Sequence, residues 1–116
     1  MALRLPLAMD PAAMRAHAGE AARLLKALGN EKRLSLLCLL LDHEQSVGEL
    51  NARLDLSQSA LSQHLALLRE DGLAQTRRDG QTIYYSLVPG SAQRILDTLH
   101  GIYCSVGPSS PAKVGP

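Results

Sequence analysis

The 116-residue sequence is poor in aromatic residues, with three Tyr and neither Phe nor Trp. Its core must therefore be aliphatic and built mainly from Leu and Ala. A chain of this length suits one domain, and a small domain with few bulky side chains buries only a limited core. Packing apolar helices against a second copy would enlarge that core, so we expect a homodimer.

The sequence also lacks a long apolar run and a large excess of charge of either sign. No apolar stretch reaches the length of a membrane span, and Pro6 interrupts the apolar N-terminus too early for a secretory signal. We therefore expect a cytoplasmic protein with no membrane partner. The formal net charge is +1, from 12 Lys and Arg against 11 Asp and Glu. Any affinity for phosphate must come from local clustering of basic residues.

Cysteine is scarce as well, with two residues in the chain. Cytosolic thiols are kept reduced, so a bond between them would be transient rather than a structural staple. A thiol reductase would need a Cys-x-x-Cys motif, and none occurs. No Ser-His-acid arrangement and no Gly-rich phosphate loop is visible either. The sequence therefore indicates a protein that is not an enzyme and has no cofactor.

Capping signals predict four helices in the first part of the chain. Asp10 is a good N-cap before Pro11, which suits the first helical position. Ser46 and Glu49 have the spacing of a capping box, and Gly72 ends the fourth helix. The second helix is apolar around most of its circumference, which is typical of a central, buried helix. The predicted helices span residues 11–28, 31–42, 47–54 and 58–71.

From residue 73 to residue 87 the hydrophobic period changes to two, which predicts strands. Asp79-Gly80 lies between two strand-like runs and is a strong hairpin signal. Residues 89–91 break the second strand and cap a last helix that continues to about Cys104. The predicted class is mainly α with a two-stranded β-hairpin, in the order α-α-α-α-β-β-α. Two short helices joined by a turn and followed by a hairpin are typical of a winged helix-turn-helix.

The ends of the chain differ in composition from its middle. The last ten residues, GPSSPAKVGP, are rich in Pro, Ser and Gly, which favours disorder. We therefore expect one domain over residues 10–106, with a flexible N-terminus at 1–9 and a disordered tail at 107–116.

The fourth predicted helix has two contrasting walls. Leu61, Leu65 and Leu68 share one side, and small neutral polar residues share the other. The second helix of a helix-turn-helix lies in the major groove of DNA, where Gln, Ser and Ala can contact base edges and the helix N-terminus can hold a phosphate. The alternative is an ordinary solvated face. The candidate DNA contacts on this helix and its cap are Ser57, Gln58, Ser59, Ser62, Gln63, His64 and Ala66.

Polar and basic residues flank the predicted hairpin turn. Arg77 and Arg78 precede it and Gln81 follows it. Arginines at a ribbon tip can contact phosphates or enter the minor groove; alternatively they only keep an exposed hairpin soluble. His64 lies between the two walls of the fourth helix, where a structural hydrogen bond and a phosphate contact are equally supported.

With these features assembled, the chain resembles the ArsR/SmtB family of small dimeric winged-helix regulators over roughly residues 21–104. The resemblance is carried by LLKALGNEKRLSLLCLLLD, SVGELNARLDLSQSALSQHLALLREDGL and TRRDGQTIYYSL. It implies a homodimer joined through the first and last helices. It also implies binding to double-stranded operator DNA, usually as a repressor that a chemical signal releases.

Many members of that family respond to metals. One family site uses a Cys-x-Cys pair near the third helix, and SVGELNARLDLS contains no Cys. Another uses Asp-x-His with a later His/Glu pair in the last helix, where this chain has only Asp97 and His100. A tight transition-metal site needs three or four well-placed ligands, so we assign no metal ligands. A metal-responsive repressor remains an alternative.

Cys38 in the second helix and Cys104 at the end of the last are placed as in the thiol-based subgroup that includes HlyU, BigR and SqrR. The resemblance implies that reactive oxygen or sulfur species link such a pair as a disulfide or polysulfide and release the DNA. For Cys38, a small apolar filler of the core is the alternative. An HlyU-like activator that displaces a silencing protein, and an interaction module that does not bind DNA, are further alternatives.

Overall fold

The structure, a computed structural model, describes residues 10–104. The predicted winged helix-turn-helix is confirmed. The predicted flexible segment at 1–9 and the predicted disordered tail at 107–116 lie outside the described residues. The elements are α1 (Pro11–Leu28), α2 (Glu31–Asp42), β1 (Gln45–Ser46), α3 (Val47–Arg53), α4 (Gln58–Glu70), β2 (Ala74–Asp79), β3 (Thr82–Leu87) and α5 (Ser91–Tyr103).

Side-chain caps fix where four of the helices begin. The side chains of Asp10, Asn30 and Ser57 each accept at least one backbone N–H from the first turn that follows. The predicted capping box is present: the Ser46 N–H donates to Glu49 Oε1 at 2.8 Å, and the Glu49 N–H donates to Ser46 Oγ at 3.2 Å. Since such a cap contributes about 1 kcal/mol, local sequence determines these boundaries.

The sheet differs from the predicted hairpin in two details. It has three antiparallel strands in the order β1-β3-β2, because the short β1 pairs with β3. The last pair of the hairpin is Asp79 with Thr82. The two-residue turn is therefore Gly80-Gln81, one position later than expected. Gly80 has a φ of 67°, a left-handed conformation that a residue without Cβ adopts at little cost.

A leucine cluster forms the core where α2, α3, α4 and the sheet meet the first half of α5. Aromatic side chains are absent from its fully buried members, as the composition requires. The sheet contributes one small residue, so the helices supply nearly all the buried apolar surface. The buried members are Leu28, Leu36, Leu37, Leu40, Leu50, Leu61, Leu65, Leu68, Ala74 and Leu96.

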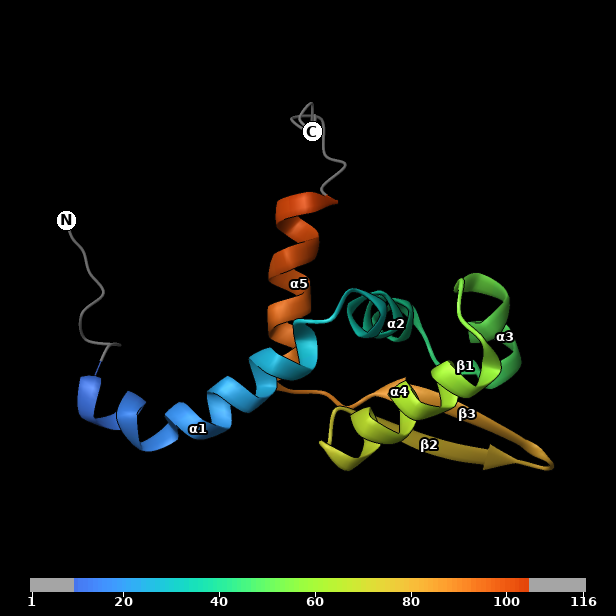
Figure 1. Cartoon of the computed structure of the whole chain (residues 1–116), viewed down its shortest axis with the longest axis horizontal. Helices are drawn as coiled ribbons and strands as arrows, with labels where there is room; N and C mark the ends of the chain where they lie inside the picture. The colour runs from blue at the N-terminus through green and yellow to red at the C-terminus, as the bar shows by residue number, and fades with distance from the viewer. Residues whose placement is uncertain (1–9, 105–116) are drawn as a thin grey trace.

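Two helices extend beyond this core (Figure 1). α1 leaves the body as an arm, and α5 projects from it in another direction. Every residue from Pro11 to Glu20 is exposed, and the buried residues of α1 are Ala27 and Leu28. The radius of gyration is 16.8 Å, whereas a compact chain of this length has about 13 Å. Among the described helices, none could serve as a membrane span.

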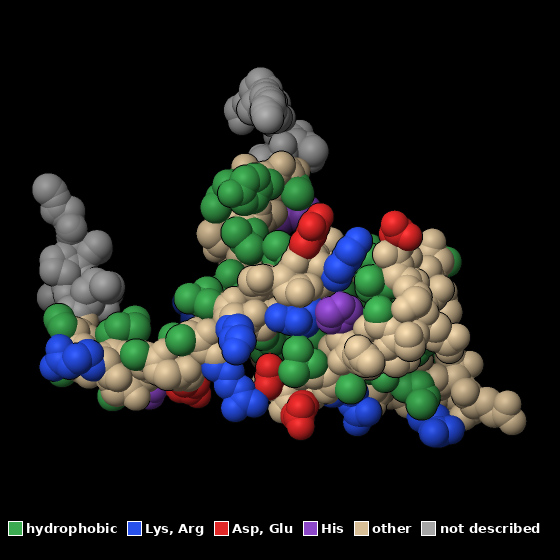
Figure 2. All heavy atoms as spheres, viewed as in Figure 1, with side chains coloured by type: hydrophobic (Ala, Val, Ile, Leu, Met, Phe, Trp, Pro, Cys, Tyr) green, Lys and Arg blue, Asp and Glu red, His purple; other side chains and the backbone are tan. Residues whose placement is uncertain are grey.

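The two arms carry exposed apolar side chains. Met14 and Leu25 of α1 are 54% and 59% exposed, and Ile102 and Tyr103 of α5 are 62% and 78% exposed. Figure 2 shows apolar atoms gathered over the free end of α5. The single chain therefore leaves apolar surface uncovered on both arms.

Candidate nucleic-acid interface and cysteine pair

α4 has the two walls expected from its sequence. Leu61, Leu65 and Leu68 are at most 1% exposed and bind the helix to the core. The opposite wall faces outward, away from the leucine cluster, and can meet another molecule without disturbing the fold. Its exposed members are Ser59, Ser62, Gln63 and Ala66.

The first turn of α4 divides its polar residues into two groups. Ser57 is the N-cap: its Oγ accepts the Ala60 N–H at 3.1 Å and lies 3.3 Å from Ser59 Oγ. Gln58 is exposed and makes no hydrogen bond through its side chain within residues 10–104. Ser57 is thus partly occupied in capping the helix, whereas the Gln58 amide can turn toward a ligand.

His64 lies at the edge of the wall and is half-buried. Burial lowers the pKa of His64, and the positive charge of Arg33 lowers it further. Arg33 is fixed there because its Nε donates to the Ala27 carbonyl at 2.8 Å and its Nη2 to the Lys26 carbonyl at 3.1 Å. Among the described residues, the histidine side chains that form hydrogen bonds are those of His17 and His43 and not that of His64, so the structural hydrogen bond is not seen and the phosphate contact stays a prediction.

The hairpin separates the two arginines that the sequence placed together. Arg77 pairs with Tyr84 and Arg78 with Ile83, and successive residues of a strand point to opposite faces. The Arg77 guanidinium donates to both carboxylate oxygens of Glu44, with Nε 3.2 Å from Oε2. It also lies 4.8 Å from the centre of the Tyr84 ring. Arg77 is therefore held on the sheet, and this ion pair lowers the pKa of Glu44.

Arg78 has a different environment. It is exposed near the hairpin tip and forms no ion pair with any residue of the described chain. Gln81 is exposed in the turn itself. Arg78 and Gln81 can therefore reach a neighbouring molecule without first breaking an internal contact.

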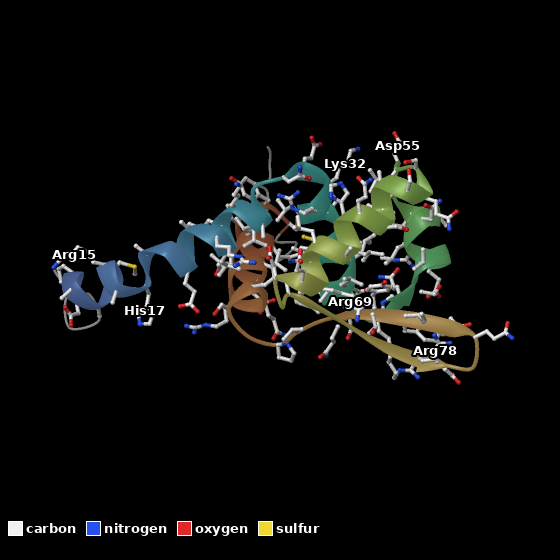
Figure 3. The ribbon with its side chains drawn as sticks, turned by 60° about the horizontal axis from the view of Figure 1, so that its bottom comes forward. Arg15, His17, Lys32, Asp55, Arg69 and Arg78 are labelled. Atoms are coloured by element: carbon white, nitrogen blue, oxygen red, sulfur yellow. The ribbon has the colours of Figure 1, made fainter. Side chains whose placement is uncertain are left out.

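Sequence reasoning identified Arg78 but missed three other charged residues around α4. Arg69 and Arg78 lie below α4 in Figure 3, and Lys32 and Asp55 lie above it. Arg69 and Lys32 are exposed and unpaired within residues 10–104. The sequence does not predict that these charged residues lie around α4, because they come from separate helices and strands.

The two cysteines are both exposed free thiols, and α2 packs against α5. The exposure of Cys38 contradicts its alternative role as a buried filler. Partial loss of solvent raises the pKa of the Cys38 thiol, and negative charge on Cys104 raises it further.

Comparison with known proteins fits this arrangement. Residues 30–76 match the family described as "Bacterial regulatory protein, arsR family". The transcriptional activator HlyU of Vibrio cholerae is 54% identical over 91 residues, which cover 78% of this chain and 84% of HlyU. The chain belongs to the ArsR family. Like its relatives, this ArsR-family protein is a DNA-binding transcriptional regulator and not an enzyme.

Two further comparisons extend the similarity. A biofilm growth-associated repressor of Agrobacterium fabrum is 46% identical over 93 residues, which cover 80% of each chain. The crystal structure of the transcriptional repressor BigR from Xylella fastidiosa matches with a TM-score of 0.77 and 40% identity, over 84% of this chain and 100% of that one. Members named as activators and as repressors therefore share this ArsR-family fold.

Proposed function

We propose that this ArsR-family regulator is a homodimeric, cytoplasmic repressor that binds operator DNA when Cys38 and Cys104 are reduced and releases it when they become linked. The observation that carries the proposal is the outward wall of α4. A wall of small polar side chains opposite a buried leucine wall suits contact with base edges in a major groove.

The proposed DNA contacts fall into two sets. Gln58, Ser59, Ser62 and Gln63 read bases, and Arg78 and Gln81 of the hairpin contact the backbone or the minor groove. Three further residues take supporting roles in this proposal: Ser57 caps α4, His64 lies half-buried at the edge of the wall, and Arg77 is held by its ion pair with Glu44.

The proposed dimer joins α1 and α5 of one protomer to those of the other. Its support is the exposed apolar surface on both arms, including Met14, Leu25, Ile102 and Tyr103. Apolar patches left exposed on a soluble protein often mark an interface, and a two-fold axis is the commonest way to cover such surfaces. Two α4 helices related by that axis would enter major grooves about one helical turn apart.

The proposed switch is a two-electron oxidation. With hydrogen peroxide, the two thiols lose two electrons and two protons, a sulfur–sulfur bond forms, and the peroxide becomes two water molecules. With two low-molecular-weight persulfides, the products are a trisulfide bridge, two thiols and hydrogen sulfide. Either bridge would fasten the end of α5 to α2 and thereby alter the dimer interface. A bias of a few kcal/mol changes DNA occupancy a hundredfold or more.

Selection of DNA by the reduced protein tests the DNA-binding part. Random 40-base-pair duplexes are enriched on the protein, and affinity for the winner is compared with affinity for random competitor at moderate salt. We expect a preference of about a thousandfold or more, as for other specific binders. Equal affinity for selected and random duplexes would overturn the proposal.

Single cysteine variants test the switch. Peroxide or persulfide should release the wild-type protein from DNA, and intact mass should show two hydrogen atoms lost for a disulfide, or one sulfur atom gained and two hydrogen atoms lost for a trisulfide. Cys38→Ser and Cys104→Ser should bind DNA and stay bound after the same treatment. Release of either variant at the wild-type rate would rule out the bridge.

A second candidate function is transcriptional activation. It is favoured by the 54% identity to a protein named as the transcriptional activator HlyU. A reporter gene behind the selected DNA separates the two candidates. Deleting the regulator raises expression if it represses and lowers expression if it activates.

A further inference from the structure

The junction between α1 and the body combines a short apolar contact with polar contacts. At the C-terminal end of α1, Ala27 and Leu28 are buried, and Leu24 is partly buried against the leucine cluster. Arg33 of α2 holds that same end by donating to two of its carbonyls. These contacts fix the position of the C-terminal end of α1. They do not fix the angle between α1 and α4, which depends on contacts nearer the middle of α1.

One ion pair makes that second connection. Arg23, in the second turn from the α1 C-terminus, donates to Asp71 Oδ1 from Nη2 at 2.7 Å and from Nε at 3.3 Å. Asp71 is the C-cap of α4, and its N–H donates to the Leu67 carbonyl at 2.9 Å. The Asp71 side chain is only 13% exposed, whereas that of Arg23 is 70% exposed. The Asp71 carboxylate is thus held in place at the end of α4, and the Arg23 side chain extends to it from α1.

Open grooves flank the pair on both sides. One has a volume of about 560 Å³ and the other about 530 Å³, and Arg23, Ala27, Glu70 and Asp71 line both. Within residues 10–104, no other hydrogen bond or ion pair joins α1 to α4. Packing therefore does not fill the angle between the helices, and the Arg23–Asp71 pair spans the gap.

We propose that Arg23 and Asp71 are positioning residues that set the angle of the dimerisation arm to the recognition helix, and hence the half-site spacing the dimer accepts. Because Asp71 is held at the end of α4 and Arg23 lies on the arm, the pair fixes the position of the arm relative to α4. An 18-residue helix is about 27 Å long. A change of about 10° at its base moves its tip by about 5 Å, more than one base-pair step of about 3.4 Å.

This inference rests on the proposed function, so one test uses DNA and another does not. In the first, the duplex selected by the wild-type protein is compared with the same duplex carrying one extra base pair between its half-sites. The wild type should bind the lengthened duplex about tenfold or more weakly, as expected when base contacts of one half-site are lost. For Arg23→Gln that ratio should fall to about threefold or less.

Two variants control the DNA test. Lys26→Gln removes a neighbouring cation of α1 that has no ion pair within the described residues, and it should keep the wild-type ratio. Reversing the pair, with Arg23→Asp combined with Asp71→Arg, should restore the wild-type ratio of the two affinities. A wild-type ratio for Arg23→Gln, or a reduced ratio for Lys26→Gln, would overturn the proposal.

The second test measures the angle directly in Cys38→Ser, Cys104→Ser protein. Spin labels are attached at Arg15→Cys and Asp55→Cys, which lie on the far part of α1 and beside the start of α4 (Figure 3). Labelled protein is diluted with unlabelled protein so that distances within one protomer dominate. Arg23→Gln should broaden the distance distribution and Lys26→Gln should not. Distance distributions of equal width in all three proteins would overturn the inference. This test does not depend on DNA binding, so it remains decisive even if the protein shows no preference among duplexes.

Discussion

The reading head and the arms cover their apolar side chains in different ways. The head, formed by α2, α3, α4 and the sheet, encloses a leucine cluster within one chain. The arms, α1 and the free end of α5, leave Leu25 and Tyr103 more than half exposed. Apolar side chains therefore differ by region: in the head they are buried within one chain, and on the arms they are exposed, where the proposed dimer would cover them. This contrast separates folding from assembly, and substitutions can test each.

The largest effect should come from a cavity in the head. Leu65→Ala removes a side chain that is 1% exposed and should lower the free energy of unfolding by about 3 kcal/mol, because it loses burial and leaves a void. Leu25→Ala is the matched change on an arm, where the side chain is 59% exposed. Urea denaturation at one protein concentration measures both. Similar losses for the two variants would contradict the contrast.

A charged residue on an arm should weaken dimerisation without changing the fold of the head. Ile102→Asp places a carboxylate on a side chain that is 62% exposed in one chain. It should weaken dimerisation by on the order of a hundredfold, as expected for the centre of an interface. Sedimentation equilibrium gives the dimer dissociation constant, and circular dichroism checks the fold. An unchanged constant would place the interface elsewhere.

Within the head, substitutions of a base contact and of a phosphate contact should have different effects on the affinity for DNA. Gln63→Ala should reduce affinity for selected DNA about tenfold while leaving random DNA nearly unaffected, since it removes a base contact. Arg78→Ala should weaken both and flatten the salt dependence by about one unit of slope. Anisotropy titrations across salt concentrations measure both effects. Equal losses on all sequences from Gln63→Ala would make it a backbone contact.

The smallest effect concerns the cysteines, of which Cys38 lies on α2 in the head and Cys104 at the end of α5. Negative charge on Cys104 raises the pKa of Cys38, so Cys104→Ser should lower it. The pH at which Cys38 reaches half its maximal alkylation rate should then move downward, because the thiolate reacts. Iodoacetamide labelling across alkaline pH, read by peptide mass, measures this. An unmoved midpoint would indicate that the two thiols are not neighbours.

Local signals account for most of what the sequence predicted. Asp10 and the Ser46–Glu49 box act within one helical turn, so the helix starts could be read directly. The leucine wall of α4 follows from a single helical period. β1 was missed because a two-residue strand shows no alternation and exists only through its pairing with β3.

The remaining features depend on residues far apart in the chain. Arg77 and Glu44 are 33 positions apart, and Arg23 and Asp71 are 48 apart. From the sequence we assigned Arg77 and Arg78 the same role, because no neighbouring residue distinguishes them. Which of the two is held on the sheet depends on the register with β3 and on a carboxylate from another segment.

The scarcity of aromatic side chains gives this molecule a built-in optical probe. Without Trp, its ultraviolet emission comes from three Tyr, two of which lie on β3. The third, Tyr103, is 78% exposed at the end of α5 and directly precedes Cys104. Its emission should therefore report both burial by a second copy and a nearby disulfide, and Tyr103→Phe would isolate that signal with no attached dye.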